Sequence, residues 1–397
     1  MKMILKNAKV ILNDFIREGF VVVEDGRILG FESKAPDLGE NPSREIDLKG
    51  LYLSPGFVDI HVHGGGGADF LGGTPQTLMS AAKCHMQYGT TTISPTVSAF
   101  SMEEFRQSID NYKAARAHMS GGPNLGGIHF EAPYINPVQR GAFEAEYIKK
   151  PDPREYCEVV DYADGVISRW TAAPELPGAL EFGEFVSRNG ILPTIGHSEA
   201  EYPIVERALG CGYKLVTHLY SATSTVVRRG GFRYPGIVES AYLLDDLAVE
   251  LIADGCHLPP EMLRMVYKIK GPDKICLVTD ACRFAGTDQT GKVLSREGRD
   301  RQVLIEDGVA KLLDRSAFSG SIATSDRLVR VMSAQAGVSL VDCIKMTCRT
   351  PARLIGIGDR TGSIEQGKDA DLIVFDQEIN IHGVMVKGSP ISGIFCI

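Results

Sequence analysis

The sequence predicts an α/β fold, a closed (β/α)8 barrel of the TIM type, with a small β-sandwich formed by the two ends of the chain. Eight short apolar segments with strand character alternate with longer amphipathic segments between residues 56 and 279, which is the usual size and order of such a barrel. Both ends of the chain carry short strands separated by Gly and Asp. The glycine run at residues 64–67 does not complete a GxGxxG fingerprint, because Asp69 takes the third position, which argues against an open dinucleotide-binding sheet.

The two ends of the chain predict a second, smaller unit. Residues 19–30 place an Asp25-Gly26 turn between two runs of β-branched and apolar residues, which is typical of a hairpin. Residues 367–376 and 381–388 read as further strands. We therefore expect residues 1–54 and 350–397 to form the sandwich and residues 55–349 to form the barrel, a division that the length of 397 residues allows.

The middle of the chain supplies the barrel elements. One connecting segment, residues 101–112, has apolar residues at helical spacing and a capping box of Ser101 and Glu104. The eight strands are expected at residues 56–60, 90–94, 125–130, 166–171, 191–195, 214–217, 249–253 and 274–279. Because catalysis in these barrels takes place at the carboxyl ends of the strands, the residues that follow each strand are the first candidates for a site.

Composition excludes several classes of protein. The net charge is −8, without a long run of either sign, which argues against a nucleic-acid or anionic-membrane surface. The nine cysteines are scattered without a CxxC pair, as in reduced cytosolic proteins. No secretion signal is evident and no apolar run approaches the roughly 20 residues that span a bilayer. We expect a cytoplasmic protein.

Imidazole or carboxylate side chains follow six of the eight expected strands, and five of the nine histidines lie there. In a strand, residues i and i+2 point to the same face, so His61 and His63 should project together. Each histidine taken alone is as well explained by a structural role. Their convergence favours a site for a divalent transition metal. The residues are His61, His63, Glu131, His197, His218, His257 and Asp280.

This combination predicts a hydrolase without a protein nucleophile. A bound divalent ion lowers the pKa of water and polarises a carbonyl oxygen. Asp280 could accept the proton of the water and later transfer it to a leaving nitrogen. His129, inside a strand, is expected to be a structural residue of the core.

Seven short motifs, in order, resemble those of the N-acetylglucosamine-6-phosphate deacetylases of the amidohydrolase superfamily. They occupy residues 55–63, 129–133, 196–198, 217–220, 252–257, 277–281 and 319–321. Residues 351–356 and 362–372 resemble the closing segment of that superfamily, where the chain returns to the β-sandwich. The resemblance covers nearly the whole chain.

The resemblance implies hydrolysis of N-acetylglucosamine 6-phosphate to glucosamine 6-phosphate and acetate. It implies that Glu131, His197 and His218 hold the principal metal, that Asp280 is the proton shuttle and that His257 contacts the substrate near the scissile amide. His61 and His63 would add a second metal position, bridged by Glu131. The metal expected is zinc, one or two ions per subunit, with iron, manganese or cobalt as alternatives. The remaining substrate-binding residues implied are Ala142, Ser221, Ala222, Arg233, Phe318, Ser319 and Gly320.

Arg233 matches the phosphate-binding arginine of the family, which is often contributed across a dimer interface, so a homodimer is expected. Other positions depart from the family pattern. Ser221-Ala-Thr223 replaces Asn-Ala-Met, Phe143 replaces a histidine and Ala132 replaces a glycine. These departures leave open an amino sugar of the galactosamine type, an unphosphorylated sugar, an N-acyl amino acid or a cyclic amide. The roles of Cys256 and Cys282 also stay open.

Overall fold

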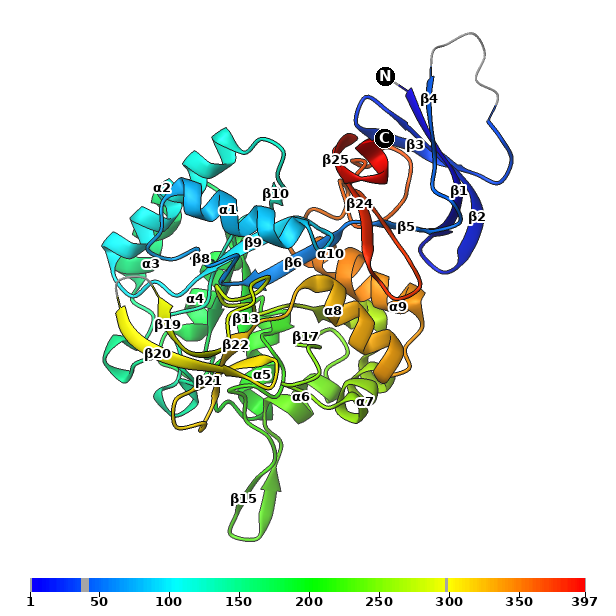
Figure 1. Cartoon of the computed structure of the whole chain (residues 1–397). Helices are drawn as coiled ribbons and strands as arrows, with labels where there is room; N and C mark the ends of the chain where they lie inside the picture. Colours follow the sequence, from blue (N-terminus) through cyan, green and yellow to red (C-terminus); the bar gives the residue numbers. More distant parts are fainter. Residues whose placement is uncertain (1, 37–42, 297–298, 397) are drawn as a thin grey trace.

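The computed structural model describes residues 2–36, 43–296 and 299–396. A barrel of parallel strands surrounded by helices forms its main body, and a sheet built from both chain ends lies beside it, with the two termini close together (Figure 1). The predicted fold class is confirmed.

The barrel strands pair in parallel with their neighbours. The barrel closes where the last strand meets the first, through hydrogen bonds from the Asp280 N–H to the His61 carbonyl (2.8 Å) and from the His63 N–H to the Ala281 carbonyl (2.8 Å). The eight predicted strands are all present: β6 (Phe57–Val62), β9 (Thr90–Val97), β11 (Ile128–Phe130), β12 (Ile167–Ala172), β13 (Leu192–Ile195), β14 (Leu215–Val216), β17 (Ala248–Leu251) and β18 (Ile275–Leu277), with β10 (Asn124–Leu125) pairing beside β9.

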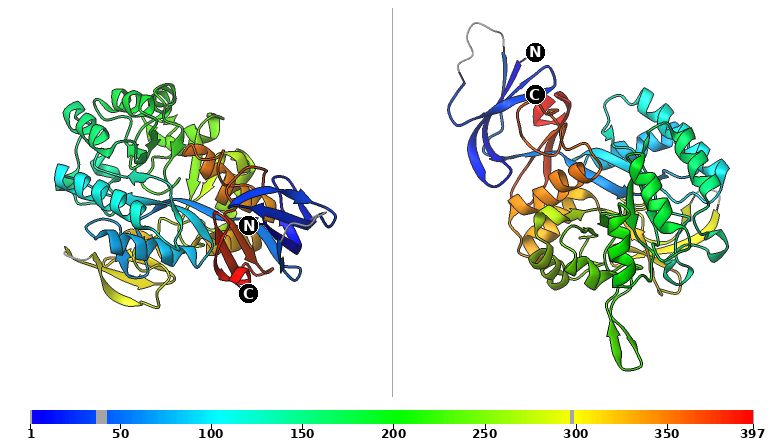
Figure 2. Two further views of the ribbon diagram at one scale, coloured as in Figure 1. Left: turned by 90° about the horizontal axis from the view of Figure 1, so that it is seen from above. Right: turned by 180° about the vertical axis from the view of Figure 1, so that it is seen from behind.

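Helices surround the barrel (Figure 2). The Ser101 side chain caps α2 by accepting the Glu104 N–H, as predicted, but Glu104 accepts the Phe100 N–H (2.8 Å) instead of closing the expected box on Ser101. The helices are α1 (Pro75–Met86), α2 (Met102–His118), α3 (Pro153–Ala163), α4 (Ala179–Arg188), α5 (Tyr202–Gly210), α6 (Ile237–Leu243), α7 (Pro260–Lys270), α8 (Ser325–Arg330), α9 (Leu340–Ile344) and α10 (Thr350–Leu354).

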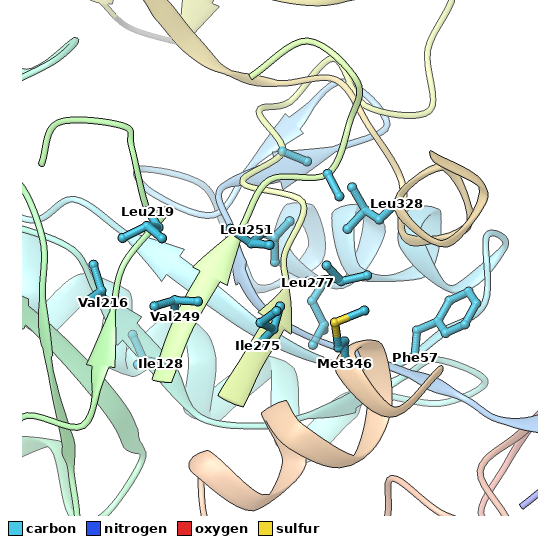
Figure 3. Close-up of a cluster of buried hydrophobic side chains, with 14 of the residues drawn as sticks. Phe57, Ile128, Val216, Leu219, Val249, Leu251, Ile275, Leu277, Leu328 and Met346 are labelled. Carbon is cyan, nitrogen blue, oxygen red and sulfur yellow. The ribbon is translucent and has the colours of Figure 1, made fainter. Parts of the chain in front are cut away.

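Apolar side chains fill the space between strands and helices (Figure 3). Val249 and Leu251 of β17 and Leu277 of β18 are at most 1% exposed, and they belong to the same cluster as Leu328 and Met346. Strands of a parallel sheet are covered on both faces, which explains their continuous apolar sequences. This packing holds the strand ends, and the polar residues on them, in fixed positions.

The terminal sheet has the order β25-β24-β23-β5-β1-β2-β3, with β4 also paired to β1. The predicted hairpin is present, and Asp25 (φ 48°) and Gly26 (φ 83°) adopt the left-handed conformation that a tight hairpin turn requires. The strands are β1 (Lys2–Ile11), β2 (Ile16–Glu24), β3 (Arg27–Glu32), β4 (Ser43–Asp47), β5 (Tyr52–Pro55), β23 (Leu372–Phe375), β24 (Ile381–Val386) and β25 (Ser389–Gly393).

This sheet has an apolar cluster of its own, including Leu5, Val21 and Leu372. Ala352 of α10, by contrast, clusters with Val58 and Val278 of the barrel. We propose the division into residues 1–54 with 350–397 and residues 55–349. The first helix of the segment 350–397, α10, packs on the barrel.

The sequence did not predict two additions to the barrel. A hairpin of β15 (Val227–Arg229) and β16 (Phe232–Tyr234) projects away from the body (Figures 1 and 2). A four-stranded antiparallel sheet, β19 (Gly291–Arg296), β20 (Arg299–Glu306), β21 (Val309–Leu312) and β22 (Phe318–Ser321), follows β18.

Candidate metal centre and active site

The predicted polar residues converge at the carboxyl ends of the barrel strands. His61 is the penultimate residue of β6, Glu131 follows β11, and His197 and His218 lie just after β13 and β14. His197 (φ 49°), His218 (φ 29°) and Asp280 (φ 47°) have positive φ angles. Such angles are unfavourable for residues with a side chain and concentrate at functional sites.

Glu131, His197 and His218 form the first cluster of potential ligands. The Glu131 Oε1 atom lies 3.1 Å from His197 Nε2 and 3.1 Å from His218 Nε2, and the two nitrogen atoms are 3.2 Å apart. All three residues are buried. Their donor atoms therefore surround one small volume.

His61, His63 and Asp280 form the second cluster, directly beside the first. The Asp280 Oδ1 atom lies 3.4 Å from His61 Nε2 and 3.2 Å from His63 Nε2. The Glu131 Oε2 atom lies 3.2 Å from His63 Nε2, while Oε1 faces the first cluster. Glu131 thus lies between the two clusters, and its Oε1 atom also lies 3.5 Å from His61 Nε2 of the second cluster.

Both clusters fit a divalent transition metal. Within each one, the three donor atoms lie within 4.8 Å of one another. The His61 Nε2 atom is buried and makes no hydrogen bond to any part of the chain that the structure describes, so a cation would satisfy it. The Nδ1 atoms of His61 and His197 face Glu250 Oε2 (3.0 Å) and the Gln139 carbonyl (2.8 Å). These acceptors fix the proton on Nδ1 and leave each Nε2 lone pair for a metal.

The electrostatics of the site favour a cation. Burial opposes a charge on His61, but Asp280, Glu250 and Glu131 outweigh it and raise the pKa of His61 to about 10. The pKa of His63 is raised to about 9 because Glu131 and Asp280 outweigh its burial. In spite of burial, these histidines lower the pKa of Asp280 to about 2 and that of Glu131 well below its usual value. The carboxylates that hold protons on the imidazoles would equally attract a metal ion.

A cavity of about 390 Å³ opens above the two clusters. It brings together all the predicted site residues except His61, buried beneath it, and Arg233. The cavity is lined by the predicted residues His63, Glu131, Ala142, His197, His218, Ser221, Ala222, His257, Asp280, Phe318, Ser319 and Gly320.

His257 is held at one side of this cavity. Its Nδ1 lies 2.9 Å from Asp254 Oδ2, and its ring packs edge-on against the Phe318 ring, 4.8 Å between centroids. Because the carboxylate accepts the Nδ1 proton, Nε2 is the atom available to a substrate.

An aromatic wall of Phe100, Phe143 and Tyr147 forms another side of the cavity. The Phe143 ring lies 5.0 Å from the His197 ring and 5.9 Å from the Phe100 ring. Of the residues that the structure describes around the cavity, none is a lysine or an arginine. Phe143 was identified from the sequence as a departure, but this wall was not predicted, because it is built by residues of two loops.

Arg233 does not reach the cavity of its own chain. It is exposed on β16 of the projecting hairpin and donates a hydrogen bond to the Gly231 carbonyl (2.8 Å). Its assignment to the phosphate of a substrate therefore stays a prediction.

Four further residues lie at or near the site and differ in their surroundings. Glu250 and Arg169, behind His61, were not predicted, although a charged residue inside an apolar strand sequence was a usable signal. His129 bonds to Thr96 and Thr171 in the buried interior, as expected of a structural histidine. Cys282 lines the cavity, and burial raises the pKa of its thiol to about 12.

Within residues 2–36, 43–296 and 299–396, no helix has both the length and the apolar character that crossing a bilayer requires.

The known proteins that this chain resembles are amidohydrolases and deacetylases of amino sugar phosphates. The model of the Amidohydrolase family matches residues 52–391. The chain is similar to the N-acetylglucosamine-6-phosphate deacetylase of Bacillus subtilis (strain 168), at 30% identity over 95% of this chain and 93% of the relative. It is 29% identical to the N-acetylgalactosamine-6-phosphate deacetylase of Shewanella sp. (strain ANA-3), over 97% of this chain and 95% of that protein.

Solved structures agree with these relatives. The N-acetylglucosamine-6-phosphate deacetylase of Pasteurella multocida matches with a TM-score of 0.90 and 28% identity, covering 98% of this chain and 99% of that one. A mutant of the Mycobacterium smegmatis enzyme, in complex with N-acetyl-D-glucosamine-6-phosphate, matches with a TM-score of 0.87 and 27% identity, covering 98% and 99%.

Proposed function

The chain belongs to the amidohydrolase family, and on that premise we propose that it hydrolyses N-acetylglucosamine 6-phosphate to glucosamine 6-phosphate and acetate. It is an enzyme, a hydrolase that acts on amides. The observation that carries the proposed reaction is the convergence of Glu131, His197, His218 and Asp280 on one cavity. Relatives named as deacetylases of amino sugar phosphates support the substrate class.

The two ligand clusters would hold one or two divalent ions. Glu131, His197 and His218 would hold the first, and His61, His63 and Asp280 the second, with Glu131 shared between them. Imidazole and carboxylate ligands together suit zinc, with iron, manganese and cobalt as alternatives. When bound, such an ion lowers the pKa of water and polarises the amide carbonyl.

The protein residues would carry the proton transfers. Asp280 is ionised: in the metal-free site the neighbouring histidines lower its pKa to about 2 in spite of burial, and a bound cation would favour the charged carboxylate in the same way. It can therefore accept the proton of the attacking water and deliver it to the amide nitrogen as the C–N bond breaks. His257, whose ring is held by Asp254 through Nδ1, would contact the scissile amide with Nε2 and orient it in the cavity.

A second candidate is an N-acyl amino sugar without phosphate. The cavity has no lysine or arginine among the described residues that line it, and Phe143 replaces a polar side chain on its wall. Aromatic residues can pack against the apolar face of a sugar ring but give nothing to a phosphate. This candidate also accommodates a galactosamine-type sugar or a different acyl group.

A homodimer would reconcile the cavity with a phosphorylated substrate. We propose that Arg233 on the projecting hairpin enters the cavity of a second copy, where a guanidinium can bind phosphate with two hydrogen bonds.

A substrate panel separates the candidates. Acetate release would be measured from N-acetylglucosamine 6-phosphate, its galactosamine isomer, both free sugars and an N-acetyl amino acid, together with the metal content of the protein. We expect the first compound to have the highest kcat/KM. A preference for the free sugars would support the second candidate, and the absence of turnover with every sugar would refute both.

A further inference from the structure

A buried pair, Glu250 and Arg169, lies directly behind the second ligand cluster and has no part in the reaction proposed above. Glu250 on β17 and Arg169 on β12 are both 0% exposed. The Arg169 Nη1 group donates to Glu250 Oε1. Arg169 also donates to the Ile60 carbonyl (3.2 Å) and to Thr217 Oγ1 (3.0 Å), which ties it to the residues that precede His61 and His218.

The second oxygen of Glu250 contacts two metal-ligand residues at once. Oε2 lies 3.0 Å from His61 Nδ1 and accepts the backbone N–H of His218 at 3.1 Å. The other oxygen of this carboxylate is paired with the guanidinium of Arg169, as expected of an ionised glutamate. An ionised carboxylate only accepts hydrogen bonds, so His61 must carry its proton on Nδ1 and present the Nε2 lone pair to the site.

The contact with His218 acts on the backbone. His218 has a φ angle of 29°, which is unfavourable for a residue with a side chain. A charge-assisted hydrogen bond to its N–H offsets part of that cost and sets the direction of the imidazole. One carboxylate therefore fixes a ring orientation in the second cluster and a backbone conformation in the first.

We propose that Glu250, held by Arg169, is a positioning residue that builds the second metal position. The inference rests on the two-metal site of the proposed function, but it concerns His61 most directly, because Glu250 is the acceptor that sets its tautomer. A carboxylate paired with a buried arginine is costly to bury. At this position the pair fixes the orientation of the His61 imidazole, which a neutral acceptor would not maintain.

The test measures binding of zinc chloride alone to protein stripped with a chelator, by competition with a chromophoric chelator and by metal analysis. We expect wild type to bind two zinc ions. Glu250→Gln should weaken the second ion about 10- to 100-fold, the usual effect of losing such a partner. It should change the first by less than about threefold, because the glutamine oxygen can still accept the His218 N–H. The visible absorption of cobalt-substituted protein should change only for the second equivalent.

Two further variants separate positioning from general destabilisation. Glu250→Asp keeps the charge that balances Arg169 but shortens the side chain, so it should fold and still lose affinity for the second ion. Asp371→Asn changes another buried carboxylate, one that accepts from Lys387 N–H and Thr361 Oγ1 far from the cavity, and it should bind both ions as wild type does. If Glu250→Gln does not fold, the charge-free double variant Arg169→Met with Glu250→Leu gives the same measurement.

Binding of both ions with wild-type affinity by Glu250→Gln, or by the double variant where it is used, would overturn the proposal. So would a single zinc ion in wild type, or equal losses in Glu250→Gln and Asp371→Asn. Because no substrate is present, the result is independent of which amide the enzyme hydrolyses, and failure of the proposed reaction would leave it unchanged.

Discussion

Asp280 combines two tasks at the residue scale, since its carboxylate faces both histidines of the second cluster and lines the cavity. Asp280→Asn should lower kcat by about 10²- to 10⁴-fold, because an amide cannot accept and return the proton. The Glu131, His197 and His218 cluster does not include it, so at least one metal ion per chain should stay bound. Steady-state kinetics with metal analysis checks both parts. Unchanged activity in a metal-loaded Asp280→Asn protein would rule out the proposed proton transfer.

Phe143 is the residue on the aromatic wall that most directly bears on the substrate. A histidine at this position would place a hydrogen-bond donor beside the bound sugar. A hydrogen bond from it to the charged phosphate would contribute about 1.5–3 kcal/mol, and the free sugar has no such group. Phe143→His should therefore raise kcat/KM for the phosphorylated sugar about tenfold or more relative to the free sugar. Phe143→Leu is the control, because it removes the ring without adding a donor. An equal gain in both variants would show that space, and not polarity, limits the substrate.

The residues that sequence reasoning found and missed differ in where they lie along the strands. His61, Glu131, His197, His218 and Asp280 stand where an apolar run ends, so the barrel alone predicts that they converge. Glu250 and Arg169 lie within strands, and only the distance of 3.0 Å between Glu250 and His61 Nδ1 shows their purpose. That distance depends on how β6, β12 and β17 are arranged around the barrel, which a single sequence does not specify.

At the scale of elements, the long alternation of strands and helices was predictable and the insertions were not. The eight barrel strands lie in apolar runs bounded by turns, whereas β15 (Val-Arg-Arg) and β16 (Phe-Arg-Tyr) contain arginines and are largely exposed. Their sequence, with two glycines between arginines, carries no apolar pattern because the hairpin packs against little of its own chain. The four-stranded sheet of β19–β22 does not follow the alternation, because its strands succeed one another without helices between them.

The arginines of the hairpin differ in their contacts, and this difference allows a specific test of Arg233. Arg229 is paired with Glu201 (2.6 Å), while Arg228 and Arg233 face each other across the hairpin. Arg233→Ala should raise KM for the phosphorylated sugar about 10- to 100-fold by removing a charged partner of the phosphate, and should leave the free sugar unaffected. Arg228→Ala is the matched control on the same hairpin. Similar kinetics for both variants would refute a specific role for Arg233.

Mixing two impaired variants, assayed with the phosphorylated sugar at a concentration below the KM of Arg233→Ala, tests whether Arg233 acts on the second copy. Arg233→Ala chains keep a complete cavity but supply no arginine, and Asp280→Asn chains supply the arginine but cannot transfer the proton. Mixed dimers should regain activity toward the phosphorylated sugar, up to about half that of a wild-type dimer. Activity equal to the average of the two separate proteins would show that Arg233 does not cross between subunits.

For the whole molecule, the barrel concentrates buried charge at one end, and this makes stability depend on both pH and metal. The raised pKa values of His61 (about 10) and His63 (about 9) mean that their protonated forms stabilise the metal-free fold below their unfolded pKa of about 6.5. That contribution is lost as pH rises toward 10. The lowered pKa values of Asp280 and Glu250 (about 2) stabilise the fold above about pH 4, and this is lost as pH falls toward 2.

Metal should reverse the alkaline part of this dependence, because its ligands are neutral imidazoles that no longer need protons. An ion that binds only the folded state adds about 4 kcal/mol at a thousandfold excess over its Kd. The difference in Tm between zinc-saturated and chelator-treated protein should therefore widen steadily from pH 6.5 to pH 9.5. Scanning calorimetry at several pH values checks this, with His61→Ala/His63→Ala as the control in which the widening is largely lost. A difference that stays constant with pH would show that proton release from these two histidines does not accompany metal binding.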